Sequence, residues 1–276
     1  MALSINQNIM AMNSYRNLSA TQGGLAKSLE KLSSGFRVNR AADDAAGLGI
    51  SEGLRSQVRG NGQAVRNAQD GISLVQTAEG ALNEVHDMLQ RMRVLAVQGA
   101  NGTNSDKNKG SINEELTALS EEIGRISKVT DFNGLKMLDG TTKEVVFQVG
   151  ANATEDDTIK VAGQDISKYK DDLDEKITAA KDNATYQALI TALDEKITDA
   201  STKRGSFGAV QNRFEHTINN LNVAVENLAA SESRIRDTDM AAEMMQFTRG
   251  QILSQAGTAM LAQANQVPQS VLSLLR

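Results

Sequence analysis

The chain has 276 residues, a formal net charge of −5, no Cys, no Trp and a single Pro. The acidic balance provides no basic stripe for nucleic acid, and the absence of cysteine excludes disulfides and thiol chemistry. An aromatic content of 3% argues against a compact aromatic-rich core and favours long helices packed on aliphatic side chains and methionine.

Membrane insertion and catalysis are also disfavoured. No apolar run approaches the roughly 20 residues of a membrane span. Residues 1–16 lack a basic region followed by an apolar core, so we expect no cleavable secretory signal peptide. His86 and His216 stand alone, outside any zinc-protease or nucleophile-elbow motif. We therefore expect a protein that is not an enzyme and has no metal, cofactor, membrane or nucleic-acid partner.

The first predicted element is an amphipathic helix that ends near the Ser34-Gly35 pair. Its apolar residues recur at helical spacing and include Leu18, Leu25 and Leu32. Arg16 is the only charged residue before Lys27. We expect so uncharged a helix to be buried by other chains and to be disordered in an isolated monomer.

A non-periodic connector follows, over residues 33–50. Its Asp43-Asp44 pair can cap the N-terminus of the next helix, where the helix dipole favours acidic side chains. The glycines at 47, 49 and 53 do not match a phosphate-binding loop, and no strand precedes them. Capping is therefore preferred over a nucleotide site.

The longest predicted helix covers residues 54–96. Its apolar seam alternates steps of four and three, which is typical of a coiled coil, with one stammer near Val75. The seam consists of Leu54, Val58, Val65, Ala68, Ile72, Val75, Ala78, Leu82, Val85, Leu89, Met92 and Ala96. The glycines at 60, 62, 71 and 80 each cost about 1 kcal/mol inside a helix, so partner helices must hold this one.

Two elements follow the long helix. Apolar residues from Ile112 to Ile126 predict another helix. It forms a helical hairpin with the long helix over residues 54–96, across a Gly/Asn/Ser loop. After a turn at residues 132–134, Val145–Val149 and Thr158–Val161 predict a β-hairpin near 142–162.

Residues 164–203 predict a short helical insert, which is too small for a separate domain. A returning helix then runs from Val210 to Ile235 with an uninterrupted apolar seam. It can form a three-helix core with the long helix over residues 54–96 and the helix from Ile112 to Ile126. The last segment is again an apolar helix, whose charges stop at Arg249 until Arg276. We expect both ends of the chain to pair with each other and with neighbouring copies.

Several motifs in a fixed order carry a family resemblance. They are residues 1–6 with the connector, Leu89–Gln98, Asp131–Gly134, Phe147–Asn152, Gly208–Arg213 and Ser231–Asp239. Over residues 1–160 and 203–276 the chain resembles bacterial flagellin, the subunit of the flagellar filament. The expected fold is mainly α: a long coiled-coil-like helical rod from paired N- and C-terminal helices, with a small β-hairpin.

The resemblance implies a division of the chain into layers. Residues 1–45 and 236–276 would form the inner filament core, and 46–163 with 204–235 an outer helical layer. Residues 164–203 occupy the place of the variable insert. The chain would self-assemble as a helical homopolymer for motility, extracellular in the bacterial flagellum. Other implied partners are the flagellar export chaperone, which would bind the C-terminal helices, and the filament cap and hook-junction proteins.

Two sets of site residues are predicted. Polymerisation would rest on apolar residues of the terminal helices, namely Ile5, Ile9, Leu25, Leu29, Leu32, Met244, Phe247, Leu253, Met260, Leu272 and Leu275. The resemblance also implies a contact with Toll-like receptor 5 through Gln90, Arg91, Leu95 and Glu115. Val94 stands where many relatives have an acid. The same residues could instead serve protofilament packing, or form a solvated face.

Two rival functions remain. A hook–filament junction protein shares the terminal helices, and a secreted ligand of a host receptor would use the Arg91 surface without forming a polymer. An enzyme would need a catalytic insert within residues 164–203, and the sequence has no such constellation there.

Overall fold

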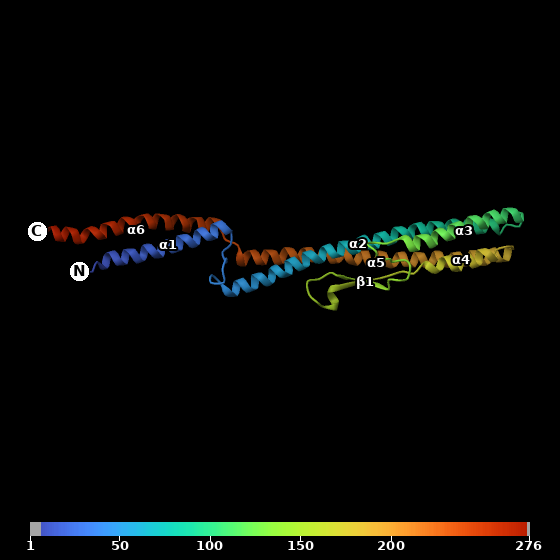
Figure 1. Cartoon of the computed structure of the whole chain (residues 1–276), viewed down its shortest axis with the longest axis horizontal. Helices are drawn as coiled ribbons and strands as arrows, with labels where there is room; N and C mark the ends of the chain where they lie inside the picture. Colours follow the sequence, from blue (N-terminus) through green and yellow to red (C-terminus); the bar gives the residue numbers. More distant parts are fainter. Residues whose placement is uncertain (1–6, 275–276) are drawn as a thin grey trace. The chain divides into compact units, whose positions relative to one another are not determined.

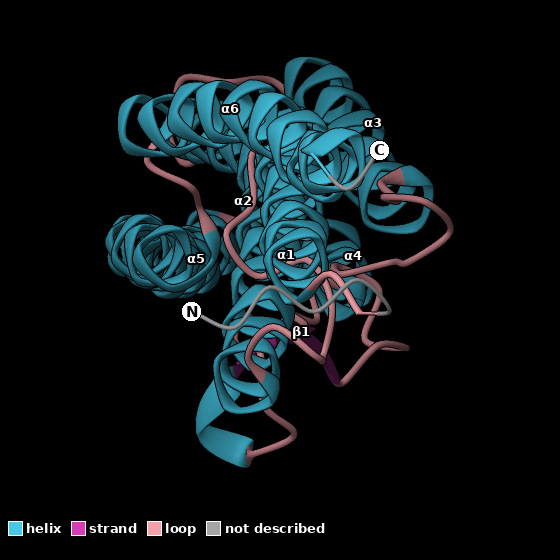
Figure 2. Ribbon diagram, turned by 90° about the vertical axis from the view of Figure 1, so that its left-hand side faces the viewer, coloured by secondary structure: helices cyan, strands magenta, loops and turns pink. Residues whose placement is uncertain are grey.

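The computed structural model describes the backbone of residues 7–274 and the side chains of residues 7–266. The elements in chain order are α1 (Ile9–Ser34), α2 (Ala45–Gly99), α3 (Asp106–Val129), β1 (Glu144–Gln148), the short 3₁₀ turn η1 (Glu155–Asp157), β2 (Thr158–Ala162), α4 (Ser167–Ala179), α5 (Asn183–Arg236) and α6 (Met240–Leu274) (Figure 1). Helix dominates, and within residues 7–274 strands occur only as one small pair (Figure 2). The prediction of a mainly α fold with one β-hairpin is confirmed.

The chain divides into two compact units. The first comprises residues 1–56 and 227–276, and the second comprises residues 57–226. Helices α2 and α5 contribute to both. Of the predicted polymerisation residues, Ile5 and Leu275 lie outside the described residues. The backbone of Leu272 belongs to α6, but its side chain is outside the described set.

In the first unit, α1 and α6 pack side by side and antiparallel (Figure 1). Leucines seven residues apart on α1 face glycines seven residues apart on α6. A methyl group added at Gly250 would lie 3.3 Å from Leu25, and one added at Gly257 would lie 3.2 Å from Leu18. Each leucine thus sits as a knob over a glycine hole, which brings the two helices close together. The predicted pairing of the two ends is confirmed.

The ends of α1 are capped by its own sequence. The Asn8 side chain accepts a hydrogen bond from the Ala11 amide at 3.0 Å, and the chain leaves the helix through Gly35 at φ 76°. Glycine adopts this left-handed conformation without steric cost. The helix therefore ends at Ser34, as predicted.

The connector uses its two acids differently. Asp44 accepts from the Gly47 amide at 2.8 Å and caps α2, as predicted. Asp43 instead accepts from the Arg40 amide at 3.0 Å and from the Asn39 amide, which folds the connector back on itself. The Arg40 hydrogen bond is the main reason why the pKa of Asp43 lies below its ordinary value.

The connector is tied to the end of α5 and to the link between α5 and α6. The Arg37 amide donates to the Arg236 carbonyl at 2.6 Å, and the Thr238 amide donates to the Gly35 carbonyl at 2.9 Å. The Arg236 guanidinium lies 4.5 Å from the centre of the Phe36 ring and binds Glu52 at 2.8 Å. The α1–α2 connector and the α5–α6 link are thereby held together within this unit.

The second unit is built on α2, α3, α4, α5 and the β-hairpin. Strands β1 and β2 pair antiparallel, with Phe147 opposite Ile159. One apolar core joins all these elements and includes Leu82, Leu89, Leu116, Leu173 and Leu193, none of which is exposed by more than 1%.

Two glycines of α2 are sites of aromatic packing. Gly71 lies against Phe214, whose ring would be 2.6 Å from an added methyl group, and Gly99 lies against Tyr186. Phe214 also meets Phe147 edge-to-face, with ring centres 5.5 Å apart. The helical cost of these glycines is thus offset by close aromatic contact.

The core is larger than the sequence pattern predicts in two respects. The α2 seam is wider than a coiled-coil seam, because Ala64, Gly71, Leu74, Leu95 and Gly99 are buried as well. The physical reason is that α2 faces several partners rather than one.

The predicted three-helix core is present but incomplete. Helix α4 adds a fourth helix through Tyr169, Leu173 and Ile177, and the returning helix begins at Asn183 rather than at Val210. Tyr186 and Leu189, from the segment predicted as an insert, are fully buried. An amphipathic segment that lies beside an incomplete core is stabilised when its apolar face covers that core.

Candidate interaction surfaces

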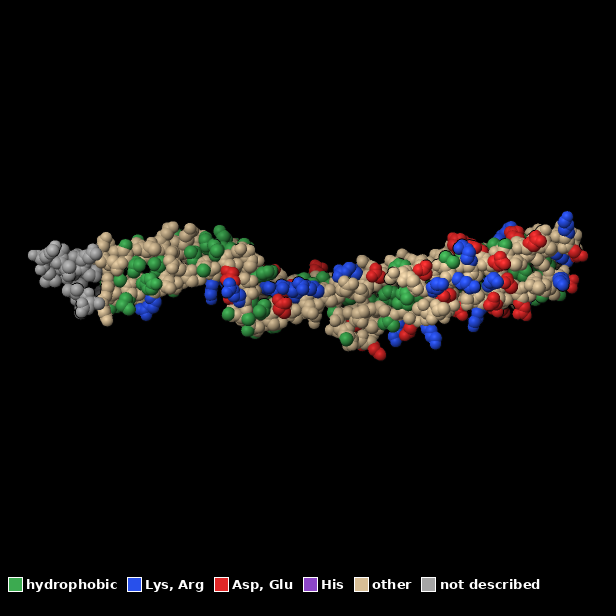
Figure 3. Space-filling model, viewed as in Figure 1, with side chains coloured by type: hydrophobic (Ala, Val, Ile, Leu, Met, Phe, Trp, Pro, Cys, Tyr) green, Lys and Arg blue, Asp and Glu red, His purple; other side chains and the backbone are tan. Residues whose placement is uncertain are grey.

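The α1–α6 pair has an exposed surface rich in large apolar side chains. These are Ile9, Met10, Met12, Tyr15 and Leu29 on α1, and Met240, Met244, Met245, Ile252, Leu253 and Met260 on α6. Hydrophobic side chains gather over this pair, whereas acidic and basic side chains are concentrated on the second unit (Figure 3). Soluble monomers rarely expose apolar surface on this scale, so the pair is suited to burial against other chains.

Few residues hold the pair together from inside. On the described parts of the two helices, the buried residues are Leu18, Ser28, Glu243 and Ala264. Both helices are long, yet most of their apolar side chains point away from their common contact. The sequence therefore supplies apolar surface that the single chain cannot cover.

The structure divides the predicted polymerisation residues into two groups. Ile9, Leu29, Met244, Leu253 and Met260 are exposed, whereas Leu25, Leu32 and Phe247 are half-buried. Leu25 is partly covered because it fills the space above Gly250.

The surface also contains residues outside the predicted set. Met10, Met12, Tyr15, Met245 and Ile252 are all exposed. The sequence signal that points to them is the scarcity of charge on every face of these helices, which a search for one apolar stripe overlooks.

The α1–α6 surface is hollowed in two places. A groove between the helices is lined by small residues, including Ser14, Ala256 and Gly257, with Leu18 and Met260 at its sides. A second hollow lies on α6 around Met244, Arg249 and Leu253. Both hollows have apolar walls that a side chain from another chain could contact.

A different, charged surface lies where α2 meets α3. The Arg91 guanidinium donates twice to one carboxylate oxygen of Glu115, at 2.7 and 3.0 Å. Gln90 is exposed one residue earlier, and its amide nitrogen lies 2.7 Å from His86 Nε2. The structure thus brings Gln90, Arg91 and Glu115 together at the surface.

Leu95, the fourth predicted receptor residue, is not on that surface. It is only 3% exposed and belongs to the apolar core beside Met92 and Ala96. Val94 is 57% exposed in its place. The four-residue step from Arg91 turns Leu95 inward because the core of this unit covers more of α2 than a single seam.

Arg93 points to a different partner. Its guanidinium donates to Asp194 of α5 at 2.6 Å, and this hydrogen bond raises the pKa of Arg93 above its ordinary value. Arg91 and Arg93 therefore bridge α2 to two different helices. Both pairs are half exposed, so each contributes little to stability.

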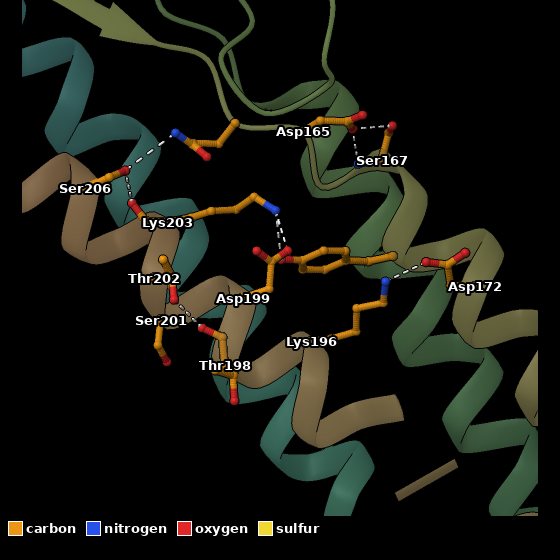
Figure 4. Close-up of polar contacts among 12 residues, drawn as sticks. Asp165, Ser167, Asp172, Lys196, Thr198, Asp199, Ser201, Thr202, Lys203 and Ser206 are labelled. Atoms are coloured by element: carbon orange, nitrogen blue, oxygen red, sulfur yellow. Dashed lines mark hydrogen bonds and ion pairs between the residues drawn. The ribbon is translucent and has the colours of Figure 1, made fainter. Parts of the chain in front are cut away.

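A polar cluster joins α4 to α5 (Figure 4). The Tyr169 hydroxyl donates to Asp199 at 2.6 Å, and Lys203 donates to the same carboxylate at 2.5 Å. Lys196 binds Asp172 at 2.5 Å, and the ammonium groups of Lys196 and Lys203 lie 5.2 and 5.0 Å from the centre of the Tyr169 ring. Burial, followed by the bond to Asp199, raises the pKa of Tyr169. Sequence reasoning missed this cluster, which fixes α4 on α5.

Among the described residues, no group of His, Cys, Asp and Glu is arranged to hold a metal ion. No described helix combines the length and apolarity needed to cross a membrane.

Comparison with known proteins gives consistent matches. The family model described as the bacterial flagellin N-terminal helical region matches residues 5–143, and the corresponding C-terminal helical region matches residues 190–275. A flagellin of Halalkalibacterium halodurans is 55% identical, and one of Bacillus subtilis is 50% identical, each over 99% of both chains.

A solved structure shares the fold. A putative flagellar hook-associated protein from Vibrio parahaemolyticus aligns with a TM-score of 0.61 at 14% identity, over 71% of this chain and 100% of that one. At this identity the likeness concerns the fold alone.

Proposed function

Because the chain belongs to the bacterial flagellin family, we propose that it is the structural subunit of the flagellar filament and that α1 and α6 carry its self-assembly. The function is structural and not enzymatic. The observation that carries the assembly proposal is the apolar surface of the α1–α6 pair, which the single chain leaves uncovered.

Burial of that surface provides a driving force for assembly. Burying one Leu, Ile or Met side chain contributes about 1.5–3 kcal/mol. Ile252, Leu253 and Met260 are each more than half exposed, so covering them in a neighbouring chain offsets a substantial ordering cost. A contact between unlike faces of successive copies generates a helical homopolymer when the rotation between copies does not close a ring.

Within the filament, we assign the terminal segments 1–45 and 236–276 to the inner core. Residues 46–163 and 204–235 form the outer helical layer, and 164–203 are the insert. The distribution of side chains supports this order, because charge is scarce on α1 and α6 and abundant on the second unit (Figure 3). Apolar surfaces are expected inside a polymer and charged surfaces at its solvent boundary.

The assembly proposal is tested by placing a charge in the apolar surface. Purified Leu253→Glu should lose sedimentable polymer, because a buried unpaired carboxylate is costly. Deletion of residues 240–276 should have the same effect. Val146→Glu is the matched control, since Val146 is 51% exposed on β1 of the other unit and the variant should polymerise. Electron microscopy and sedimentation report the outcome, and normal filaments from Leu253→Glu would contradict the proposal.

We assign the other proposed partners, namely the export chaperone and the cap and hook-junction proteins, to the same apolar surface. Before assembly the α6 surface must be shielded, and we assign this role to the flagellar export chaperone. Filament cap and hook-junction proteins would contact it at the ends of the polymer. Export would use the flagellar secretion apparatus. Leu253→Glu should weaken chaperone binding as well, which co-purification of the two proteins measures.

Recognition by Toll-like receptor 5 is a second proposed activity. It is supported by the exposure of Gln90, Arg91 and Glu115 on adjoining faces of α2 and α3. Arg91 would offer a bidentate cationic group beside the exposed Val94. Leu95 would support this surface from the core rather than contact the receptor.

The receptor proposal predicts a loss of binding that is separate from polymerisation. Arg91→Ala should weaken receptor binding about tenfold or more, the effect of losing a charged hydrogen-bonding group at an interface. Arg125→Ala, which removes an exposed arginine paired with Glu122 on α3, should leave it unchanged. The chain lacking residues 240–276 should still bind through Arg91. Equal binding by Arg91→Ala and the native chain would contradict this assignment.

A further inference from the structure

We propose that Asn101 is a site of spontaneous conversion to aspartate and isoaspartate, and that the fold protects the other Asn–Gly dipeptides of the chain. These dipeptides lie at 61–62, 101–102 and 133–134. Their sequence is the same, yet the structure places each in a different hydrogen-bonding environment.

The reaction requires a free backbone amide after the asparagine. The glycine nitrogen attacks the side-chain carbonyl carbon, a new C–N bond forms, and the bond to the side-chain nitrogen breaks. Ammonia leaves with the proton of the glycine amide, and a five-membered succinimide remains. Water then opens this ring at either carbonyl, which gives aspartate or isoaspartate. Glycine obstructs ring closure least because it has no Cβ.

The dipeptide at 61–62 is protected by the helix. Asn61 and Gly62 lie inside α2, far from both of its ends. An interior helical amide donates to the carbonyl four residues earlier, so its nitrogen is already engaged. Ring closure there requires the helix to open first.

The dipeptide at 133–134 is protected by a tight turn. Asn133 and Gly134 have φ values of 52° and 81°, as in a two-residue hairpin turn. Phe132 and Leu135 exchange two hydrogen bonds of 3.0 Å across the turn. The Gly134 amide donates to the Asp131 carboxylate at 3.0 Å, which occupies the nitrogen that would attack.

Asn101 has no comparable protection. It lies in the exposed loop between α2 and α3, and within the described part of the chain the Gly102 amide makes no hydrogen bond. The Asn101 side-chain oxygen accepts from the Thr103 amide at 3.4 Å, which polarises the carbonyl that would be attacked. The reactive carbon is thus activated while its nucleophile is free.

Conversion would change the α2–α3 link. It places a carboxylate just beyond the C-terminus of α2, where the helix dipole disfavours an anion. Isoaspartate also lengthens the backbone within a loop that is closed by the bond from the Asn104 amide to the Asn101 carbonyl at 3.2 Å. We therefore expect loosening of this loop and one additional negative charge on the modified chain.

The test compares the three sites in one molecule. The full chain is incubated in mildly alkaline buffer and cut with trypsin, which separates the sites into peptides 60–66, 94–107 and 129–136. Isoaspartate in each is measured by mass spectrometry and by enzymatic methylation. Conversion at Asn101 should be about tenfold faster than at Asn133, the factor expected when one good hydrogen bond must break first.

Two controls separate fold from sequence. Asp131→Ala removes the acceptor of the Gly134 amide and should raise the rate at Asn133, while Gly102→Ala should slow the rate at Asn101. In guanidinium the three native sites should react at similar rates. Equal rates at Asn101 and Asn133 in the folded chain would overturn the proposal. A preference for Asn101 that persists unchanged after unfolding would overturn it as well.

Discussion

At the residue scale, the carboxylate of Asp199 links acid sensitivity to the contact between α4 and α5. Burial by itself raises the pKa of Asp199, but hydrogen bonds from Lys203 and Tyr169 outweigh it, so the pKa lies below the ordinary value of 3.8. A carboxyl whose pKa is lowered by folding stabilises the native state at pH values above the unfolded pKa. That stabilisation is lost as the pH falls through the folded pKa.

Asp199→Asn should therefore lower the free energy of unfolding near neutral pH, by about 1 kcal/mol for a partly exposed charged hydrogen-bond group. The difference between native and variant should shrink below pH 3.8. Urea unfolding at several pH values measures it. Tyr169→Phe keeps the ring beside the lysines and removes one donor, so its effect should be smaller and in the same direction. A difference that does not change with pH would contradict this account.

At the scale of the element, two glycines of α2 should respond to the same substitution with opposite signs. Gly71→Ala places a methyl group 2.6 Å from Phe214, and overpacking of this kind costs about 1–3 kcal/mol. Gly80 is exposed with no atom within 4 Å of an added Cβ, so Gly80→Ala should gain about 1 kcal/mol of helix propensity. Chemical unfolding of the monomer compares the two, and stabilisation by Gly71→Ala would show that the helices can separate without loss.

The elements also show how far sequence reasoning reaches. Periodicity located the helices and both strands because it reflects local burial, as in the seam from Leu82 to Ala96. It did not reveal the pairing of Gly71 with Phe214 or of Tyr169 with Asp199, because residues distant in sequence meet only after folding. The resemblance placed Leu95 on the receptor surface, and the single predicted seam left it out of the core. The number of partners around α2 determines how much of that helix is buried, and Leu95 is only 3% exposed.

At the scale of the whole molecule, the two units should differ in stability before assembly. The α1–α6 pair encloses few buried side chains, whereas residues 57–226 share one continuous core. Helices with few buried apolar contacts open locally at low free energy. We therefore expect rapid amide hydrogen exchange before residue 40 and after residue 240 in a verified monomer, and slow exchange along the core segments of α2 and α3.

Assembly should reduce that contrast. When neighbouring chains cover Ile9, Leu253 and Met260, opening α1 or α6 must also break contacts between chains, so exchange in both helices should slow in the filament while the second unit changes little. Hydrogen exchange with mass spectrometry on monomer and polymer of the same preparation measures both states. Strong protection before residue 40 in the monomer would mean that the leucine–glycine contacts alone stabilise the pair. The apolar surface would then drive association without being needed to order the helices.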